Sequence, residues 1–233
     1  MKVLFSKNKN FDKTLDSLLF KRRKKIISDK VSVTKIINDV KNNGDKALIK
    51  YEKKFSSKKS NSNKIKFSKN EINKISKTIN KKLKFSIDLA FKRIKLFHSK
   101  QKFSSFKYKD QFDNLLSYNY SPIDSVGVYV PGGTASYPST VLMNCIPALV
   151  AGVKNIYLTT PALTSTINPA IIYAAKKCGV KEIYKTGGAH SIAALTYGTK
   201  TFKKVDKIVG PGNAFVAAAK KEVFGDVGID MVA

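Results

Sequence analysis

The stretch VGVYVPGGTASYPSTVLMNCIPALVAGV, at residues 126–153, decides the fold of this chain. A run of β-branched residues leads into a Gly-rich turn, and a helical pattern follows. Two later stretches repeat this design: EIYKTGGAHSIAAL at residues 182–195 and KIVGPGNAFVAAAKKEVFG at residues 207–225. Gly-rich turns between parallel strands and helices bind dinucleotides at the carboxyl ends of the strands. The sequence therefore predicts a phosphorylated or nucleotide ligand at these turns.

Strand and helix patterns alternate throughout the second half of the chain. Strands are expected at residues 126–130, 155–159, 182–185 and 207–209, with a fifth at 227–231, and helices at 139–151, 168–178, 190–197 and 213–224. This alternation is typical of a doubly wound parallel sheet. We therefore predict an α/β fold in which a helical N-terminal region is followed by a doubly wound, Rossmann-like parallel sheet.

The first half is mostly helical by its apolar spacing. Residues 11–27 and 34–40 each predict a short helix, and Asn42-Asn43-Gly44 predicts a C-cap and turn. Asp45 is expected to cap the helix that follows.

A second group of signals lies between residues 53 and 120. Residues 53–64 are rich in Ser, Lys and Asn and predict an exposed loop. Ser68 with Glu71 forms a capping-box pattern, which marks the start of one long helix extending to residue 97. Residues 103–120 predict one or two strands. The expected organisation is a helical arm at residues 1–30, a mostly helical region at residues 31–122 and a Rossmann-like domain at residues 123–233.

The net charge of +28 lies mainly in the first half. Residues 1–120 contain 33 Lys and Arg against 10 Asp and Glu, whereas residues 121–233 contain 11 against 6. A basic region can indicate nucleic-acid or membrane binding. Here 41 of the 44 basic residues are Lys, spread over every segment, while base recognition favours Arg. We therefore expect no specific nucleic-acid partner and only weak, salt-sensitive binding of polyanions.

Cysteines and hydropathy bear on the location of the chain. Cys145 and Cys178 lie in apolar helical patterns without a CxxC spacing, which favours reduced thiols over a disulfide. The opening residues, MKVLFSKNKNF, lack the apolar run of a signal peptide. No stretch approaches the ~18 apolar residues of a membrane span. The prediction is a cytoplasmic protein without a membrane partner.

Glycines allow the backbone of each turn to approach a ligand closely. The turns are Pro131-Gly132-Gly133, Gly187-Gly188 and Gly210-Pro211-Gly212. Ser139 is expected to cap the helix after the first turn, and His190 and Asn213 stand at the starts of the next two helices. The GxGxxG fingerprint of dinucleotide-binding folds is absent, as is an acidic residue about 20 positions after the first turn. The residues alone thus indicate a phosphorylated or nucleotide ligand and nothing more specific.

Side chains suited to catalysis are few. His98 falls near the end of the long helix, which favours a structural role, whereas His190 beside a Gly turn fits a ligand contact as well as a structural role. Asp206 and Asp230 fit turn or cap positions. The His and Cys spacing matches no zinc site, and no Ser–His–acid grouping is evident. We therefore expect neither a catalytic residue nor a metal ligand within these 233 residues.

Several motifs together carry a resemblance to a known family. They are SVGVYVPGG at residues 125–133, STVLMNCIPALVAGV at 139–153, CGVKEIYKTGGAHSIAALTYGT at 178–199 and VDKIVGPGNAFVAAAK at 205–220, with weaker matches in NNGDKALIKYEKKF at 42–55 and IKLFHSKQK at 94–102. The chain resembles histidinol dehydrogenase over nearly its whole length. The Tyr-Val-Pro-Gly-Gly and Gly-Pro-Gly-Asn pieces are the most specific.

The resemblance implies a zinc-dependent oxidoreductase of L-histidine biosynthesis. Such an enzyme oxidises L-histidinol to L-histidine through the aldehyde and reduces two NAD molecules in turn. By position, the NAD contacts of the family fall on Tyr129, His190 and Asn213. The family forms homodimers, and its NAD-binding domain is inserted within a second α/β domain. The resemblance thus implies that residues 123–233 are the NAD-binding domain and that residues 31–122 are the incomplete first part of the second α/β domain.

The chain departs from the family pattern at single residues and in length. His190 stands where the family usually has Gln, Ser121 where an Arg precedes the Pro, and Val232 where a Pro follows Asp-Met. Family members continue past the position of Ala233 into a Gly-Pro-Ser-Glu segment with a substrate-binding Ser. The zinc ligands and the Glu and His of acid–base chemistry come later still.

Two hypotheses of different classes follow from this resemblance. The first is a truncated histidinol dehydrogenase that is inactive alone and acts as a homodimer or with a complement that carries the missing part. The second is a non-catalytic remnant or binding protein that keeps the nucleotide fold. The charge of the chain adds a third alternative, a basic nucleic-acid-associated protein, which the spread of the lysines disfavours.

Overall fold

The structure is a computed structural model that describes residues 4–55, 65–132, 137–161 and 167–232, with the backbone alone for residues 21–31. Most of the loop expected at residues 53–64 lies outside these ranges, and so does Gly133.

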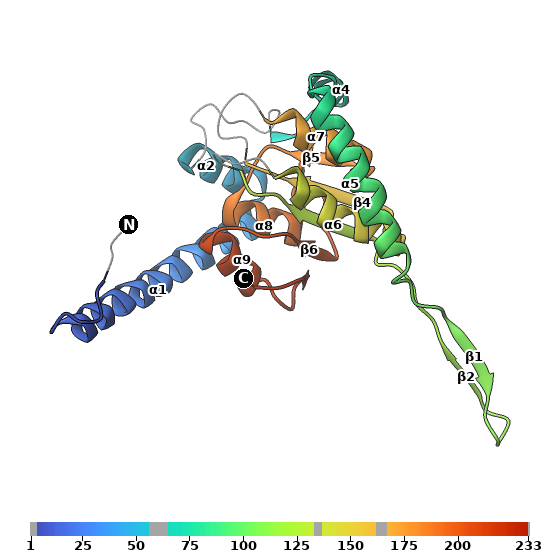
Figure 1. Ribbon diagram of the computed structural model, residues 1–233, viewed down its shortest axis with the longest axis horizontal. Coiled ribbons are helices and arrows are strands. Elements are labelled where there is room, and N and C mark those ends of the chain that lie inside the picture. The colour runs from blue at the N-terminus through green and yellow to red at the C-terminus, as the bar shows by residue number, and fades with distance from the viewer. Residues whose placement is uncertain (1–3, 56–64, 133–136, 162–166, 233) are drawn as a thin grey trace.

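A five-stranded parallel sheet forms the centre of the described structure (Figure 1). Its strands are β3 (Ser125–Tyr129), β4 (Asn155–Thr159), β5 (Glu182–Tyr184), β6 (Lys207–Val209) and β7 (Gly228–Ile229). The spatial order is β5-β4-β3-β6-β7, and every neighbouring pair is parallel. The chain thus starts in the middle of the sheet, moves outward on one side and then builds the other side. The predicted doubly wound parallel sheet is confirmed.

Four helices follow the strands in turn: α6 (Pro138–Ala151), α7 (Pro169–Lys177), α8 (Gly188–Tyr197) and α9 (Ala214–Glu222). All four lie where the sequence patterns predicted helices. The prediction that Ser139 caps α6 is wrong, because Tyr137 occupies the N-cap without a side-chain hydrogen bond. Pro138 takes the first helical position, for which its fixed φ is suited, and places Ser139 inside the first turn.

Helices from both halves of the chain cover the two faces of the sheet (Figure 1). One layer holds α6 and α7 with α4 (Lys69–Lys77) and α5 (Lys81–Ser99), and the other holds α8 and α9 with α1 (Phe11–Asn43) and α2 (Asp45–Phe55). Each layer has its own buried core, one around Val128 and Ile146 and the other around Leu48 and Ile192. The N-terminal helices are therefore part of the same three-layer arrangement as the sheet.

The N-terminal helices differ from the sequence expectation in two places. Residues 11–43 form one helix, where two short ones were expected, because the Lys- and Arg-rich stretch between them contains no helix breaker. The expected boundary at residue 30 consequently falls within α1. Gly44 ends α1 as predicted, with φ +52° and its N–H bonded to the Val40 carbonyl. Asp45 does not cap α2; its carboxylate accepts a hydrogen bond from the Thr201 hydroxyl at 2.7 Å.

The capping box of Ser68 and Glu71 is present at the start of α4, as predicted. The expected long helix is nevertheless two helices, because α4 ends at Lys77 and α5 begins at Lys81. Asn80 caps α5 by accepting a hydrogen bond from the Lys82 N–H at 2.8 Å. The apolar spacing continues across this break, so periodicity alone does not reveal it.

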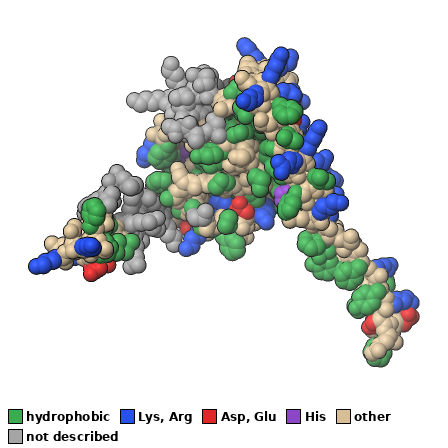
Figure 2. Space-filling model, viewed as in Figure 1, with side chains coloured by type: hydrophobic (Ala, Val, Ile, Leu, Met, Phe, Trp, Pro, Cys, Tyr) green, Lys and Arg blue, Asp and Glu red, His purple; other side chains and the backbone are tan. Residues whose placement is uncertain are grey.

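A β-hairpin projects from the end of α5 away from the sheet (Figure 1). It consists of β1 (Phe106–Lys109) and β2 (Leu115–Tyr118), which pair antiparallel, where the sequence predicted one or two strands. Every residue of both strands is exposed, and Figure 2 shows hydrophobic side chains gathered along this arm.

Residues 66 and 67 cover the outer edge of β5, which is the last strand on that side of the sheet. The Phe67 N–H donates to the Ile183 carbonyl at 2.9 Å, and Lys66 forms a bridge with Tyr184. This contact satisfies backbone groups that an open sheet edge would otherwise expose.

Cys145 and Cys178 are free thiols and both are buried, in agreement with the expectation of reduced cysteines. A hydrogen bond with Cys178, together with burial, raises the pKa of Cys145 well above its ordinary value. Among the described residues, no helix has the length and apolar character needed to cross a membrane.

Candidate functional site

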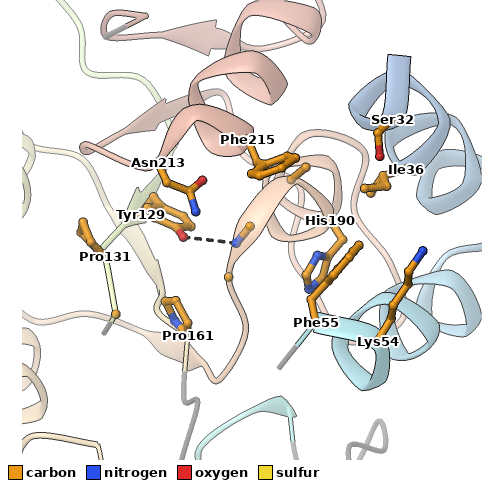
Figure 3. Close-up of a pocket in the computed structure, with 14 residues that line it drawn as sticks. Ser32, Ile36, Lys54, Phe55, Tyr129, Pro131, Pro161, His190, Asn213 and Phe215 are labelled. Atoms are coloured by element: carbon orange, nitrogen blue, oxygen red, sulfur yellow. Dashed lines mark hydrogen bonds between the residues drawn. The ribbon is translucent and has the colours of Figure 1, made fainter. Parts of the chain in front are cut away.

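A cavity of about 590 Å³ lies at the carboxyl edge of the sheet (Figure 3). Its lining comes from the turns after four strands and from two N-terminal helices. After the strands come Tyr129, Pro131, Gly132, Pro161, Gly187, Gly188, Ala189, His190, Asn213 and Phe215, and from α1 and α2 come Ser32, Ile36, Lys54 and Phe55. The strand order reverses between β3 and β6, and this is the place where doubly wound sheets form a ligand crevice.

Glycines let three of these turns meet at the cavity wall. A β-carbon on Gly132 would lie 2.7 Å from the Pro161 carbonyl oxygen, and one on Gly187 would lie 2.5 Å from the Pro161 ring. Both distances are too short for any side chain. The turns after β3 and β5 therefore pack directly on the turn after β4, and only glycine permits this approach.

Tyr129 ends β3 and forms one wall of the cavity. Its hydroxyl accepts a hydrogen bond from the Gly188 N–H at 3.2 Å, and the residue is 3% exposed (Figure 3). Burial raises the pKa of the phenol above its ordinary value, so the group stays neutral. Because Gly188 is the first residue of α8, this bond satisfies a helix N–H that has no partner within the helix. Tyr129 thereby fixes the start of α8 against β3.

Asn213 caps α9 at the end of the turn after β6. Its side-chain oxygen accepts a hydrogen bond from the Val216 N–H at 3.1 Å. The amide NH₂ forms no hydrogen bond with another described residue, and Asn213 is exposed. The cap thus directs two potential donors of the amide toward the space where a ligand would lie.

His190 is the third residue of α8 and is anchored to α2. Its Nε2 atom lies 2.9 Å from Oε2 of Glu52 and 3.1 Å from the hydroxyl oxygen of Thr186. The Thr186 hydroxyl donates to the same Glu52 oxygen. His190 is 2% exposed, and its ring packs near Tyr51 and Phe55 at centroid distances of 6.3 and 6.2 Å. The imidazole is therefore held by a buried carboxylate from the first half of the chain.

Comparison with known proteins identifies the family. A family model described as histidinol dehydrogenase matches residues 20–233. The chain belongs to the histidinol dehydrogenase family. This is a family of oxidoreductases of histidine biosynthesis.

Curated relatives and a solved structure agree with this assignment. The chain is 58% identical to histidinol dehydrogenase of Pelagibacter ubique (strain HTCC1062) over 99% of its own length and 53% of the relative. It is 43% identical to histidinol dehydrogenase of Carboxydothermus hydrogenoformans over its full length and 54% of the relative. The crystal structure of histidinol dehydrogenase from Elizabethkingia anophelis matches 86% of this chain and 46% of that chain, with a TM-score of 0.80 and 42% identity. The chain spans about half the length of the curated relatives it matches.

The structure brings the three predicted NAD contacts of the histidinol dehydrogenase family to one cavity. Tyr129, His190 and Asn213 come from three different turns and all line it. Their contact with NAD stays a prediction. The other departures from the family pattern, Ser121 and Val232, are exposed and lie outside this lining.

The contribution of α2 to the site was not predicted. Phe55 and Lys54 line the cavity, and Glu52 holds His190 from behind. Tyr51 and Phe55 are four residues apart and so share one helix face, which is a signal that an apolar surface packs there. Nothing in the sequence distinguishes Glu52 from other acidic residues, because its burial depends on how α2 packs against α8.

The remaining acidic and His residues considered from the sequence lie elsewhere. His98 is half-buried in the last turn of α5, with Nδ1 2.6 Å from the Gln101 side-chain oxygen. Asp206 accepts hydrogen bonds from the N–H and hydroxyl of Ser125 at 2.8 Å. Asp230 accepts one from the Gly210 N–H at 2.8 Å and pairs with Lys220. These contacts are structural, but those of Asp206 and Asp230 join separate elements instead of forming the expected local turns or caps.

Potential metal ligands do not gather at this cavity. Across the part of the chain that the structure describes, no three His, Cys, Asp or Glu side chains lie together in a group able to hold a metal ion. The residues present therefore do not fit a zinc site.

Proposed function

We propose that the cavity binds NAD and that this chain supplies the cofactor-binding part of a histidinol dehydrogenase, which oxidises L-histidinol to L-histidine through the aldehyde. The observation that carries the proposal is the position of the cavity. It lies at the carboxyl ends of neighbouring parallel strands, with Tyr129, His190 and Asn213 on its walls. Membership of the histidinol dehydrogenase family supports the same ligand.

The residues present fit a dinucleotide. A volume of about 590 Å³ suits a small-molecule cofactor. Phe55 and Phe215 offer apolar surfaces for flat rings, and the turns at Gly132 and Gly187 bring backbone close to the cavity. Lys54 places a cation at the lining, where it would attract phosphate groups.

In this proposal the chain's own residues bind and orient the cofactor. NAD, when bound, accepts the hydride that leaves the substrate. Tyr129 stays neutral and buried, so it supplies a rigid wall and a fixed helix start, while Asn213 offers amide donors and His190 an imidazole nitrogen. The described residues do not form a zinc site, and no step of the reaction is assigned to zinc here.

The test of the cofactor site is a calorimetric titration of the folded chain with NAD. We expect saturable binding, weakened about 10-fold or more by Gly187→Ala, because the new methyl group would push the Pro161 turn out of place. Gly179→Ala is the matched control. It also replaces a turn glycine, with φ +71° and open space around it, and lies outside the cavity lining, so it should cost stability and leave NAD affinity unchanged. Absence of NAD binding by the folded wild-type chain would contradict the proposal.

The lack of a metal-ligand group among the described residues makes a second prediction. A polypeptide of these 233 residues, supplied with L-histidinol, NAD and zinc, should form no NADH, because its described residues offer no metal site. Turnover that appears on addition of the other half of a relative would support the enzyme over a non-catalytic nucleotide-binding protein. Turnover by the 233-residue polypeptide alone would contradict the prediction.

A further inference from the structure

Glu52 is a buried acid in α2, a helix whose lysines are all exposed. It is 2% exposed, and its carboxylate meets both Thr186 and His190. Burying a carboxylate is costly unless hydrogen bonds compensate for the lost water. The contact of Glu52 with Thr186 and His190 therefore indicates a role for this carboxylate besides the packing of α2.

The hydrogen bonds around Glu52 determine which imidazole nitrogen carries a proton. The single hydroxyl proton of Thr186 goes to Glu52, so the Thr186 oxygen acts toward His190 as an acceptor. The Glu52 carboxylate is an acceptor as well. Because Nε2 of His190 faces two acceptors at 2.9 and 3.1 Å, that nitrogen must carry hydrogen and donate it.

The second ring nitrogen of His190, Nδ1, is the one that lies beside the cavity-lining turn. In the described part of the chain, Nδ1 of His190 makes no hydrogen bond. A β-carbon built on Gly188 would lie 3.5 Å from Nδ1, which places this nitrogen beside the turn that lines the cavity. The rings of Tyr51 and Phe55 pack near the imidazole and restrict its rotation.

Resting on the NAD site proposed above, we infer that Glu52 is a positioning residue for His190. With Thr186 it holds the proton on Nε2, so that Nδ1 is the nitrogen presented to the nucleotide. When the ring is neutral, Nδ1 is an acceptor and selects a donor on the ligand, such as an amide or a ribose hydroxyl. Glu52 itself does not touch the ligand.

The protonation pattern can be measured in the protein before any substitution. The chain has two His residues, so long-range nitrogen–proton NMR correlations of the full chain give two ring systems, and His98→Gln identifies the ring of His98. We expect a protonated Nε2 on His190 in the free protein and a shift of Nδ1, more than of Nε2, on adding NAD. A bare Nε2 with a protonated Nδ1 would overturn the inference.

Substitution then tests whether Glu52 acts through His190. Glu52→Gln keeps the shape of the side chain but can turn an amide NH₂ donor toward Nε2 of His190. Both neutral tautomers of the imidazole should then be populated, and NAD affinity should fall about 10-fold. In a His190→Gln background the same change should cost less than about 3-fold, because a Gln amide pairs with either a carboxylate or another amide. Glu182→Gln is the matched control. It removes a partly buried carboxylate that pairs with Lys66 outside the cavity lining, and should leave NAD affinity unchanged.

The outcomes separate the inference from the function on which it rests. A folded wild-type chain that fails to bind NAD would overturn the proposed function and the ligand contact of Nδ1 with it. NAD binding that is equal in wild type and Glu52→Gln, with the His190 resonances unchanged, would overturn the inference and leave the NAD site standing. A loss of affinity that is the same in both backgrounds would also overturn it, because Glu52 would then act independently of His190.

Discussion

Asn213 caps a helix and lies where we propose that it contacts NAD, and one substitution can separate these two roles. Its oxygen caps α9, and its amide NH₂ forms no hydrogen bond with another described residue. Asn213→Asp keeps the capping oxygen, and a carboxylate is favourable at a helix N-terminus. The same change removes both amide donors and adds negative charge beside a ligand that carries phosphates.

We predict that Asn213→Asp lowers NAD affinity about 10-fold while the free energy of unfolding stays within about 0.5 kcal/mol of wild type. Calorimetric titration measures the first quantity and urea unfolding the second. Asn80→Asp is the control, since Asn80 caps α5 in the same way and lies outside the cavity lining. Equal NAD affinity in Asn213→Asp and wild type would show that the amide does not contact the ligand.

At the scale of elements, the sequence correctly predicted the strands and caps that depend on residues close together in the chain. The bounds of β4 and β6 agree with the expected strands, and the Ser68–Glu71 capping box is formed, because these features are set by local hydrogen bonds and side-chain patterns. The break between α4 and α5 was missed because the helical spacing of apolar residues continues across it. The Asn80 cap that starts α5 leaves that spacing unchanged.

In the candidate site, too, the sequence predicted the local motifs and missed a contact between distant parts of the chain. The Gly turns and the residues beside them follow from short motifs, and the structure places them on one cavity. The contact of Glu52 with His190 joins residues 138 positions apart and depends on the packing of α2 against α8. A sequence pattern read along one chain carries no information of that kind.

Asp88 links two helices of one layer and makes their contact depend on pH. On α5 it accepts hydrogen bonds from Tyr173 at 2.7 Å and Lys177 at 2.6 Å, both on α7, and from Lys84 at 3.0 Å. Burial would raise the pKa of Asp88, but these bonds outweigh it and hold the pKa well below its ordinary value. A depressed pKa in the folded state stabilises the protein above the unfolded-state pKa, about 3.9, and this stabilisation is lost as pH falls through the folded pKa.

We therefore predict that Asp88→Asn lowers the free energy of unfolding by about 1 kcal/mol at neutral pH, a modest value because the site is partly exposed to water. The difference from wild type should shrink as the pH falls below about 4. Urea unfolding at a series of pH values measures it. Asp113→Asn is the control, because Asp113 pairs with Lys109 on the exposed hairpin and should change nothing. A difference that stays constant down to acid pH would contradict the role of the charge.

The whole molecule is a sheet whose two helical layers are shared between both halves of the chain. The division at residues 122 and 123 stays a prediction, but α1 and α2 pack on one face and α4 and α5 on the other. Sequence reasoning assigned these helices to a different domain because their composition differs sharply from the rest. Composition reports solvent exposure and charge, whereas the layer a helix joins depends on its narrow apolar face.

The charge of the whole molecule gives the last prediction. Lys and Arg side chains gather along one side and at the projecting ends of the face drawn in Figure 2, where acidic side chains form only small separate groups. We expect the chain to bind heparin and DNA of any sequence in low salt, and to lose about 10- to 100-fold in affinity between 50 and 200 mM salt if two to four phosphates are contacted at once. Fluorescence anisotropy with two unrelated DNA sequences measures this. Saturating NAD should not compete, because the cavity lining is mainly apolar side chains and glycine, with Lys54 as its lysine. Binding that prefers one sequence, or that resists salt, would instead indicate a built nucleic-acid site.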